Sequence, residues 1–212
     1  MTGIASLPWA GMVALGAWHG INPAMGWLFA VALGVQEESG RAVWRALGPL
    51  ALGHALAVGA AVLAALMIGS VVPRLFLQWF VAALLIAFGV YRLVCRRHPR
   101  WVGMRVGPRD LALWSALMAL AHGAGLMVLP FVLGAAAPVG MQATHGIAGA
   151  PGSVIGVWAT VVHAAAYLLV TGTVAVIVYE KLGLRLLRSA WLNVDVIWAS
   201  ALIVTGVLTP LL

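Results

Sequence analysis

The sequence has few charged residues. Only 8% of its 212 residues are charged, and only five residues are acidic. Soluble domains have about a quarter of their residues charged, so this composition excludes a water-soluble globular fold. With 64% hydrophobic residues and a mean hydropathy of +1.07, the chain is predicted to be an integral membrane protein.

Cysteine is almost absent too. Cys95 is the only one, which excludes an intramolecular disulfide and a metal site built from several thiolates.

The chain also lacks a Gly-rich phosphate-binding loop ending in Gly-Lys-Ser/Thr, so we do not expect it to hydrolyse ATP. The net charge of +7 does not indicate a nucleic-acid partner, because arginines at the ends of apolar runs match anionic lipid headgroups.

Six apolar runs are long enough to cross a bilayer as helices. A hydrocarbon core of about 30 Å requires about 20 residues, and backbone polar groups in lipid must be paired internally. The predicted fold is therefore an all-α integral membrane protein with six transmembrane helices. The predicted spans are Pro8–Gly34, Leu47–Gly69, Leu75–Val94, Leu111–Gly134, Val154–Tyr179 and Trp191–Leu212.

The basic residues predict the orientation. With the N-terminus outside, eleven of the twelve Lys and Arg residues fall in the three loops that then face the cytoplasm, and only Arg74 does not. The positive-inside rule therefore predicts a multi-pass protein of the inner membrane with both termini in the periplasm.

The two halves of the chain, residues 1–94 and 111–212, look like copies joined by a basic cytoplasmic loop at 95–110. Three motifs occur in the same order in each half: His19-Gly20 and His122-Gly123, His54-Ala55 and His163-Ala164, and Leu85–Val90 and Leu202–Val207. Because each copy has three spans, the second would enter the membrane from the opposite side. Two inverted three-helix repeats are common in transporters, which bind substrate near the midplane between the repeats.

Four histidines lie inside the predicted spans: His19, His54, His122 and His163. Polar residues at this depth are costly and usually face the protein interior. Imidazole is the commonest metal ligand, so we predict that the four bind a divalent cation such as Ni²⁺, Co²⁺, Zn²⁺ or Cu²⁺. The alternative is that each only forms a hydrogen bond between helices.

Three further polar positions are candidates for a substrate site. Pro23 cannot donate a backbone hydrogen bond, so we expect a kink that frees the His19 carbonyl beside Asn22. A broken helix at membrane depth is tolerated where it is buried or lines a cavity. Asp195, near the cytoplasmic start of the sixth span, is a candidate to bind a proton or cation during transport. The alternative is that it is only an acidic residue favoured at a helix N-terminus.

The topology, the basic central loop and two short motifs together resemble the LysE-type transporter superfamily, especially its nickel/cobalt exporter branch. The motifs are His19-Gly20-Ile21-Asn22-Pro23 and Ala121-His122-Gly123. The resemblance implies a secondary transporter that exports a divalent metal, although it also allows an amino acid or other small solute. Coupling to protons would use the histidines or Asp195.

Other classes of function stay open. Paired histidines on facing helices could be axial ligands of haem in a membrane electron carrier. Three histidines and a water on zinc would suffice for an intramembrane metalloenzyme, and an accessory protein could instead deliver metal to a partner enzyme. We favour a transporter over an enzyme because no general base is evident near the histidines. Glycines such as Gly53 and Gly89 permit close packing within one chain or in a homo-oligomer.

Overall fold

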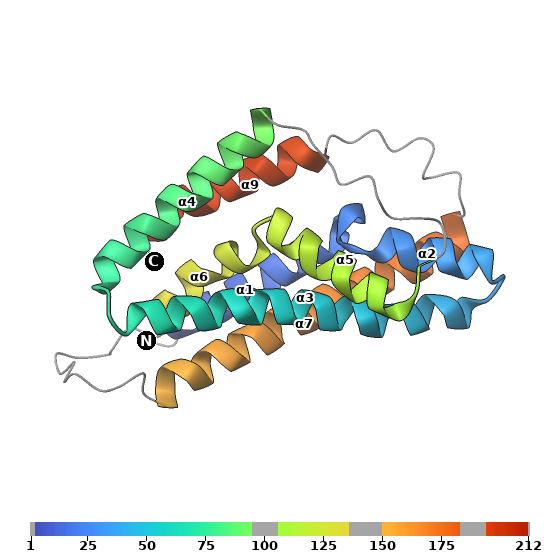
Figure 1. Cartoon of the computed structure of the whole chain (residues 1–212), viewed down its shortest axis with the longest axis horizontal. Helices are drawn as coiled ribbons and strands as arrows, with labels where there is room; N and C mark the ends of the chain where they lie inside the picture. Colours follow the sequence, from blue (N-terminus) through green and yellow to red (C-terminus); the bar gives the residue numbers. More distant parts are fainter. Residues whose placement is uncertain (1–2, 95–105, 136–149, 183–193, 212) are drawn as a thin grey trace.

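The computed structural model describes residues 3–94, 106–135, 150–182 and 194–211, and in these ranges the chain is helical and contains no strand. This confirms the all-α fold class. The elements in chain order are α1 (Gly3–Ile21), η1 (Pro23–Met25), α2 (Trp27–Gln36), α3 (Gly40–Gly69), α4 (Arg74–Val94), α5 (Pro108–Ala121), α6 (Ala124–Ala135), α7 (Ala150–Ile177), η2 (Val178–Leu182), α9 (Val194–Leu208) and η3 (Thr209–Leu211) (Figure 1).

Several of these helices are long and apolar enough to cross a membrane. Three qualify within the described ranges: Gly40–Gly69, Leu75–Val94 and Val154–Lys181. The pair α5 and α6 is bent by 62° and would count as a fourth span. The described parts of the remaining apolar helices, Trp27–Gln36 and Val196–Leu208, are shorter than the roughly 20 residues that a straight span needs. Six spans therefore stay a prediction.

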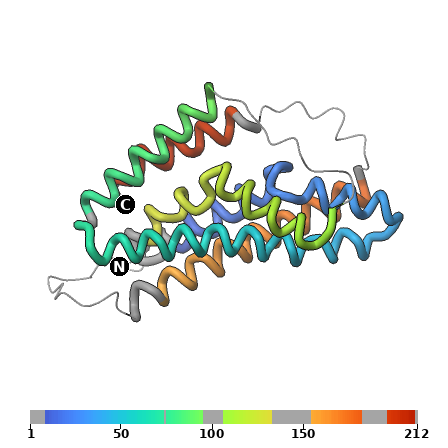
Figure 2. Tube along the Cα trace, in the orientation of Figure 1, coloured from blue at the N-terminus to red at the C-terminus, as the bar shows by residue number. Residues whose placement is uncertain are grey.

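The helices form two layers. α4 and α9 lie side by side and contact α6, whereas α3, α5, α1 and α7 form the larger bundle (Figure 1). The most extensive contacts join α1 to α7, α3 to α5, and α4 to α9. The described beginning of α1 and the end of η3 lie at the same end of the molecule (Figure 2).

The helix that carries His19 is broken, as predicted. α1 ends at Ile21, a short 3-10 turn follows, and Gly26 has a φ of 133°, which L-residues rarely adopt, before α2 begins at Trp27. The Asn22 Oδ1 atom accepts a hydrogen bond from the Ala24 N–H at 3.0 Å and so caps the turn. Sequence and structure thus agree that the first apolar run is two helical pieces.

A second break includes the corresponding histidine of the other half, His122. α5 ends at Ala121, Gly123 has a φ of 68°, and α6 begins at Ala124. Pro130, another residue that could have bent this run, lies inside α6. In both halves the first helix therefore breaks at a histidine or within two residues of it.

α3 begins earlier than predicted. The apolar run suggested a start at Leu47, but the helix begins at Gly40 and continues through Pro49 to Gly69. Hydropathy marks only the apolar part of a helix, whereas the first turns of α3 contain Arg41 and Arg45. The helix therefore extends about 10 Å beyond the apolar run, at 1.5 Å for each residue.

α4 and α9 contact each other through two reciprocal glycines. A Cβ atom on Gly89 would lie 2.9 Å from the carbonyl oxygen of Ala199, and one on Gly206 would lie 3.0 Å from that of Ala82. Ala199 comes seven residues before Gly206, and Ala82 comes seven residues before Gly89. The two contacts are therefore equivalent, with the roles of the helices exchanged. Such reciprocity is what a local two-fold axis between the helices produces.

Gly89→Ala and Gly206→Ala should each destabilise the protein by about 1–3 kcal/mol, because the added methyl group forces α4 and α9 apart. Thermal unfolding in detergent, followed by circular dichroism, measures the loss. Gly48→Ala is the matched control, since a Cβ there meets nothing within 4 Å. Equal melting temperatures for the three variants would contradict the close approach.

Candidate functional site

Three of the four predicted histidines meet in the interior of the larger bundle. The ring centroids of His19 lie 5.6 Å from His54 and 5.0 Å from His163, and those of His54 and His163 lie 5.3 Å apart. None of the three side chains is exposed. His54 is the fifteenth of 30 residues in α3 and His163 the fourteenth of 28 in α7, so both lie midway along their helices.

Small residues on α1 allow this convergence. A Cβ on Gly16 would lie 2.3 Å from the His163 carbonyl oxygen, and one on Gly20 would lie 2.7 Å from the Tyr167 carbonyl oxygen. Close backbone approach at glycines is a common way for membrane helices to pack. Here it brings the His19 ring of α1 onto the His163 ring of α7.

The hydrogen bonds of the cluster determine which ring nitrogens carry protons. The His19 Nδ1 atom lies 2.6 Å from the Leu15 carbonyl oxygen, and a carbonyl only accepts, so this nitrogen is the donor. In a neutral imidazole, His19 Nε2 then keeps its lone pair, which is the form that binds a metal. The Nε2 atoms of His54 and His163 lie 3.2 Å apart, so one of them donates and the other accepts.

Several buried polar atoms at the site lack a hydrogen-bond partner among the described residues. These atoms are Trp18 Nε1, His19 Nε2, Asn22 Nδ2, His54 Nδ1 and His163 Nδ1. An unpaired polar group in an apolar interior costs about 1–3 kcal/mol. The site therefore has hydrogen-bond donors and acceptors that are not used, although buried polar groups are generally paired.

Two aromatic residues that the sequence analysis did not select complete the site. Tyr167 stacks on His54 with centroids 3.9 Å apart and donates its hydroxyl proton to the Met25 carbonyl at 2.6 Å. Trp198 contacts His19 edge-on at 4.6 Å. Tyr167 follows His163 by four residues, so helical spacing was a signal for it, whereas nothing local distinguishes Trp198.

His122 is separate from the three-histidine cluster. Trp198 contacts the His122 ring at 5.4 Å and donates its indole proton to the His122 carbonyl at 2.7 Å, so it stands between His122 and His19. The His122 Nδ1 atom lies 2.9 Å from the carbonyl oxygen of Met118, four residues earlier. His19 makes the same kind of contact with the carbonyl oxygen of Leu15. The two histidines thus share a local geometry, but only His19 faces His54 and His163.

One expectation about the kink is wrong. The His19 carbonyl is not free, because it accepts a hydrogen bond from the Asn22 N–H at 3.2 Å. In a continuous helix the N–H of residue 23 would bond to the His19 carbonyl, but proline has no N–H. The chain instead forms an i to i−3 bond, of the 3-10 type, from Asn22 to that carbonyl just before the 3-10 turn at Pro23. Asn22 itself is buried, as expected for a site residue, and is 3% exposed.

The four acidic residues whose side chains the structure describes do not join the cluster. The carboxylates of Glu37, Glu38, Asp110 and Glu180, which the structure describes, are all exposed. Asp195 is in the first turn of α9, and its side chain lies outside the described residues. A carboxylate base beside the three histidines, which a metalloenzyme would use, is therefore not found in the described part.

The distance between the Nε2 atoms of His54 and His163 is close to that of two ligands on one metal ion and shorter than that of two axial haem ligands. Across the described ranges, no three His, Cys, Asp or Glu side chains are arranged to hold a metal ion as they stand. Two imidazole nitrogens on one tetrahedral ion would be about 3.3 Å apart, close to the 3.2 Å between His54 and His163. Axial ligands on opposite sides of a haem iron would be about 4 Å apart, twice a bond of about 2.0 Å, which this pair does not allow without separating.

The hydrogen bond between His54 and His163 should appear as an energetic coupling. We expect the His54→Leu/His163→Leu double variant to be about 0.5–2 kcal/mol more stable than the sum of the single losses predicts. Unfolding free energies in mixed micelles with a metal chelator measure this. The control pairs His54→Leu with Thr173→Ala, a residue about 15 Å further along α7 that bonds only within its own helix in the described structure. Equal coupling in both pairs would contradict the bond.

Comparisons with known proteins identify no relative. No protein-family model matches the chain, and neither a curated protein nor a solved structure is recognisably similar to it. The resemblance to LysE-type transporters therefore depends on the sequence motifs alone.

Proposed function

We propose that the protein is a secondary membrane transporter that carries a divalent transition-metal cation through a site formed by His19, His54 and His163. The observation that supports this most is the convergence of three buried imidazoles with three unpaired ring nitrogens beside a helix break. A cation bound there would use His19 Nε2, which is otherwise buried without a partner, and the Nε2 atoms of His54 and His163 in place of the hydrogen bond between them. Borderline ions such as Ni²⁺, Co²⁺, Zn²⁺ and Cu²⁺ match imidazole ligands.

The proposed architecture has six spans in two inverted repeats, residues 1–94 and 111–212. Three features support it: the first helix of each half is broken at or close to a histidine, α1 packs on α7 as α5 packs on α3, and Gly89 and Gly206 contact each other's helix reciprocally. In this scheme α1 with α2 forms the first span, and α9 with η3 forms the last. Inverted repeats allow alternating access by an exchange of conformation between the halves.

His19 and His122 would then have alternating roles. Both hold their Nδ1 atom against the carbonyl four residues earlier, so Nε2 is the nitrogen that each would use to bind a cation. In the conformation described, His19 faces the other two histidines and Trp198 separates His122 from His19. In the opposite-facing conformation, His122 would replace His19.

This scheme separates binding from transport. His19→Ala should lower both the affinity for Ni²⁺ or Zn²⁺ and the transport rate at least tenfold, because one of three ligands is lost. His122→Ala should leave equilibrium affinity in this conformation within about twofold, yet slow transport at least tenfold. Isothermal titration in detergent and ion uptake into proteoliposomes measure the two quantities.

The matched control is Tyr91→Phe, which removes an exposed hydroxyl group from α4. It should match the unmodified protein in both assays. If all three variants bind and transport these ions alike, the histidines have only a structural role, and an organic substrate replaces the metal in this proposal.

The proposed location is the inner membrane, with both termini in the periplasm. The described ends of α2 and α7 and the starts of α3 and α5 gather at one end of the molecule, where Gly34 and Gly40 pack against Tyr179 (Figure 1). Arg41, Arg45, Arg109 and Lys181 belong to these helix ends, which supports a cytoplasmic position by the positive-inside rule.

Reporter fusions test this orientation. An alkaline phosphatase domain, which folds only outside the cytoplasm, should be active when fused after Leu212 and inactive when inserted after Glu38. A fluorescent protein that folds only in the cytoplasm should give the reverse pattern. Activity of the phosphatase at Glu38 would invert the proposed topology.

A further inference from the structure

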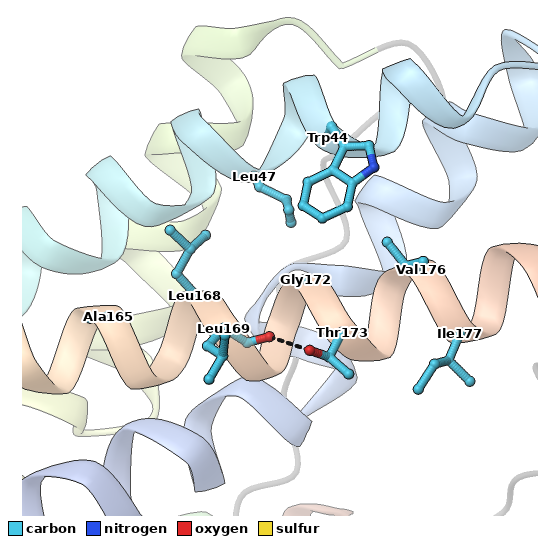
Figure 3. Close-up of a pocket in the computed structure, with 9 residues that line it drawn as sticks. All are labelled: Trp44, Leu47, Ala165, Leu168, Leu169, Gly172, Thr173, Val176 and Ile177. Atoms are coloured by element: carbon cyan, nitrogen blue, oxygen red, sulfur yellow. Dashed lines mark hydrogen bonds between the residues drawn. The ribbon is translucent and has the colours of Figure 1, made fainter.

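An apolar groove runs along the outside of the bundle between α3 and α7. Its volume is about 610 Å³. α3 contributes its upper wall and α7 its floor (Figure 3). The groove is lined by Trp44, Leu47, Ala165, Leu168, Leu169, Gly172, Thr173, Val176 and Ile177.

The length of the groove matches one leaflet of a bilayer. Its lining runs along α7 from Ile177 to Ala165, which is about 18 Å at 1.5 Å for each residue. Half of a hydrocarbon core is about 15 Å. The one polar side chain of the lining, Thr173, bonds to the Leu169 carbonyl of its own helix, so the groove presents an apolar surface over this depth.

A basic hollow adjoins the groove at the start of α3. It has a volume of about 540 Å³ and is lined by Ser39, Arg41, Trp44 and Arg45. Trp44 lines both spaces and is 63% exposed, as expected for an aromatic residue at the boundary between headgroups and acyl chains. The two spaces therefore share one lining side chain.

The charges of the hollow favour an anion. Arg45 forms an ion pair with Glu37, whereas Arg41 is exposed and has no ion pair within the described ranges. The lining of the hollow contains two guanidinium groups and no carboxylate, because Glu37 and Glu38 lie outside it. Guanidinium groups bind phosphate oxygens in a bidentate manner.

We infer that the groove and the hollow together bind one anionic phospholipid, with an acyl chain between α3 and α7 and the phosphate at Arg41 and Arg45. The combination of a cationic end, an interfacial tryptophan and an apolar groove one leaflet long matches this ligand. The site is separate from the three histidines and does not depend on the proposed transport.

Native mass spectrometry of the full chain in detergent tests the headgroup contact. The purified protein is titrated with phosphatidylglycerol or with phosphatidylcholine of the same acyl chains. Phosphatidylglycerol should bind at least tenfold more tightly, and Arg41→Gln should weaken it about fivefold. Arg109→Gln, which removes an equal charge from α5, should leave it unchanged.

Glu37→Gln gives a result of opposite sign. Removing this carboxylate frees Arg45, so phosphatidylglycerol should bind several-fold more tightly than to the unmodified protein. Equal affinities for the two lipids, or equal losses for Arg41→Gln and Arg109→Gln, would overturn the inference because they indicate only general attraction to charge.

The groove itself is tested by filling it. Ala165→Trp at its far end should weaken phosphatidylglycerol binding at least fivefold, whereas Leu63→Trp, on an exposed part of α3 outside the groove, should not. Unchanged binding in Ala165→Trp, together with displacement of the lipid by inorganic phosphate, would reduce the site to a phosphate pocket and overturn the acyl-chain contact. A doubled mass that Ala165→Trp abolishes would identify a second copy of the chain as the occupant instead.

Discussion

Helices in a bilayer gain little from the hydrophobic effect when they pair, so their association depends on close packing and interhelical hydrogen bonds. In this protein the backbone contact between α1 and α7 is the interaction on which the histidine site depends. Gly16 and Gly20 bring α1 against the carbonyl groups of His163 and Tyr167. A bulkier residue at either position would move His19 away from the other two rings.

The same contact explains how the helix break is stabilised. Backbone groups released at a break must be paired because lipid offers no partners. Tyr167 pairs the Met25 carbonyl, and Trp27 donates its indole proton to the Ile21 carbonyl at 2.9 Å. Side chains around the break therefore replace much of the helical hydrogen bonding that is lost there.

The sequence was sufficient to predict the helical class, the kink at Pro23 and the burial of His19, His54, His122 and His163, because each follows from local cost in a membrane. It also predicted that Gly89 and Gly206 occupy equivalent places.

The sequence could not predict which histidines meet. That depends on how α1, α3 and α7 pack and on Trp198, which stands between His19 and His122, and no local pattern encodes these contacts. The hydrogen bond from the Asn22 amide to His19 was missed for the same kind of reason, since proline spacing alone does not distinguish a simple kink from a 3-10 turn.

The arrangement around Trp198 is the feature that the proposed transport cycle depends on. A purely structural set of histidines would be expected to pair all its nitrogens, as buried polar groups generally do. Instead, the three clustered rings each keep one unpaired nitrogen, while Trp198 contacts the edges of two histidines that occupy corresponding places in the two halves. In the proposed scheme, movement of this indole accompanies the exchange of His19 and His122 beside His54 and His163. An inverted-repeat transporter needs such an exchangeable contact between its halves, and a static packing core does not.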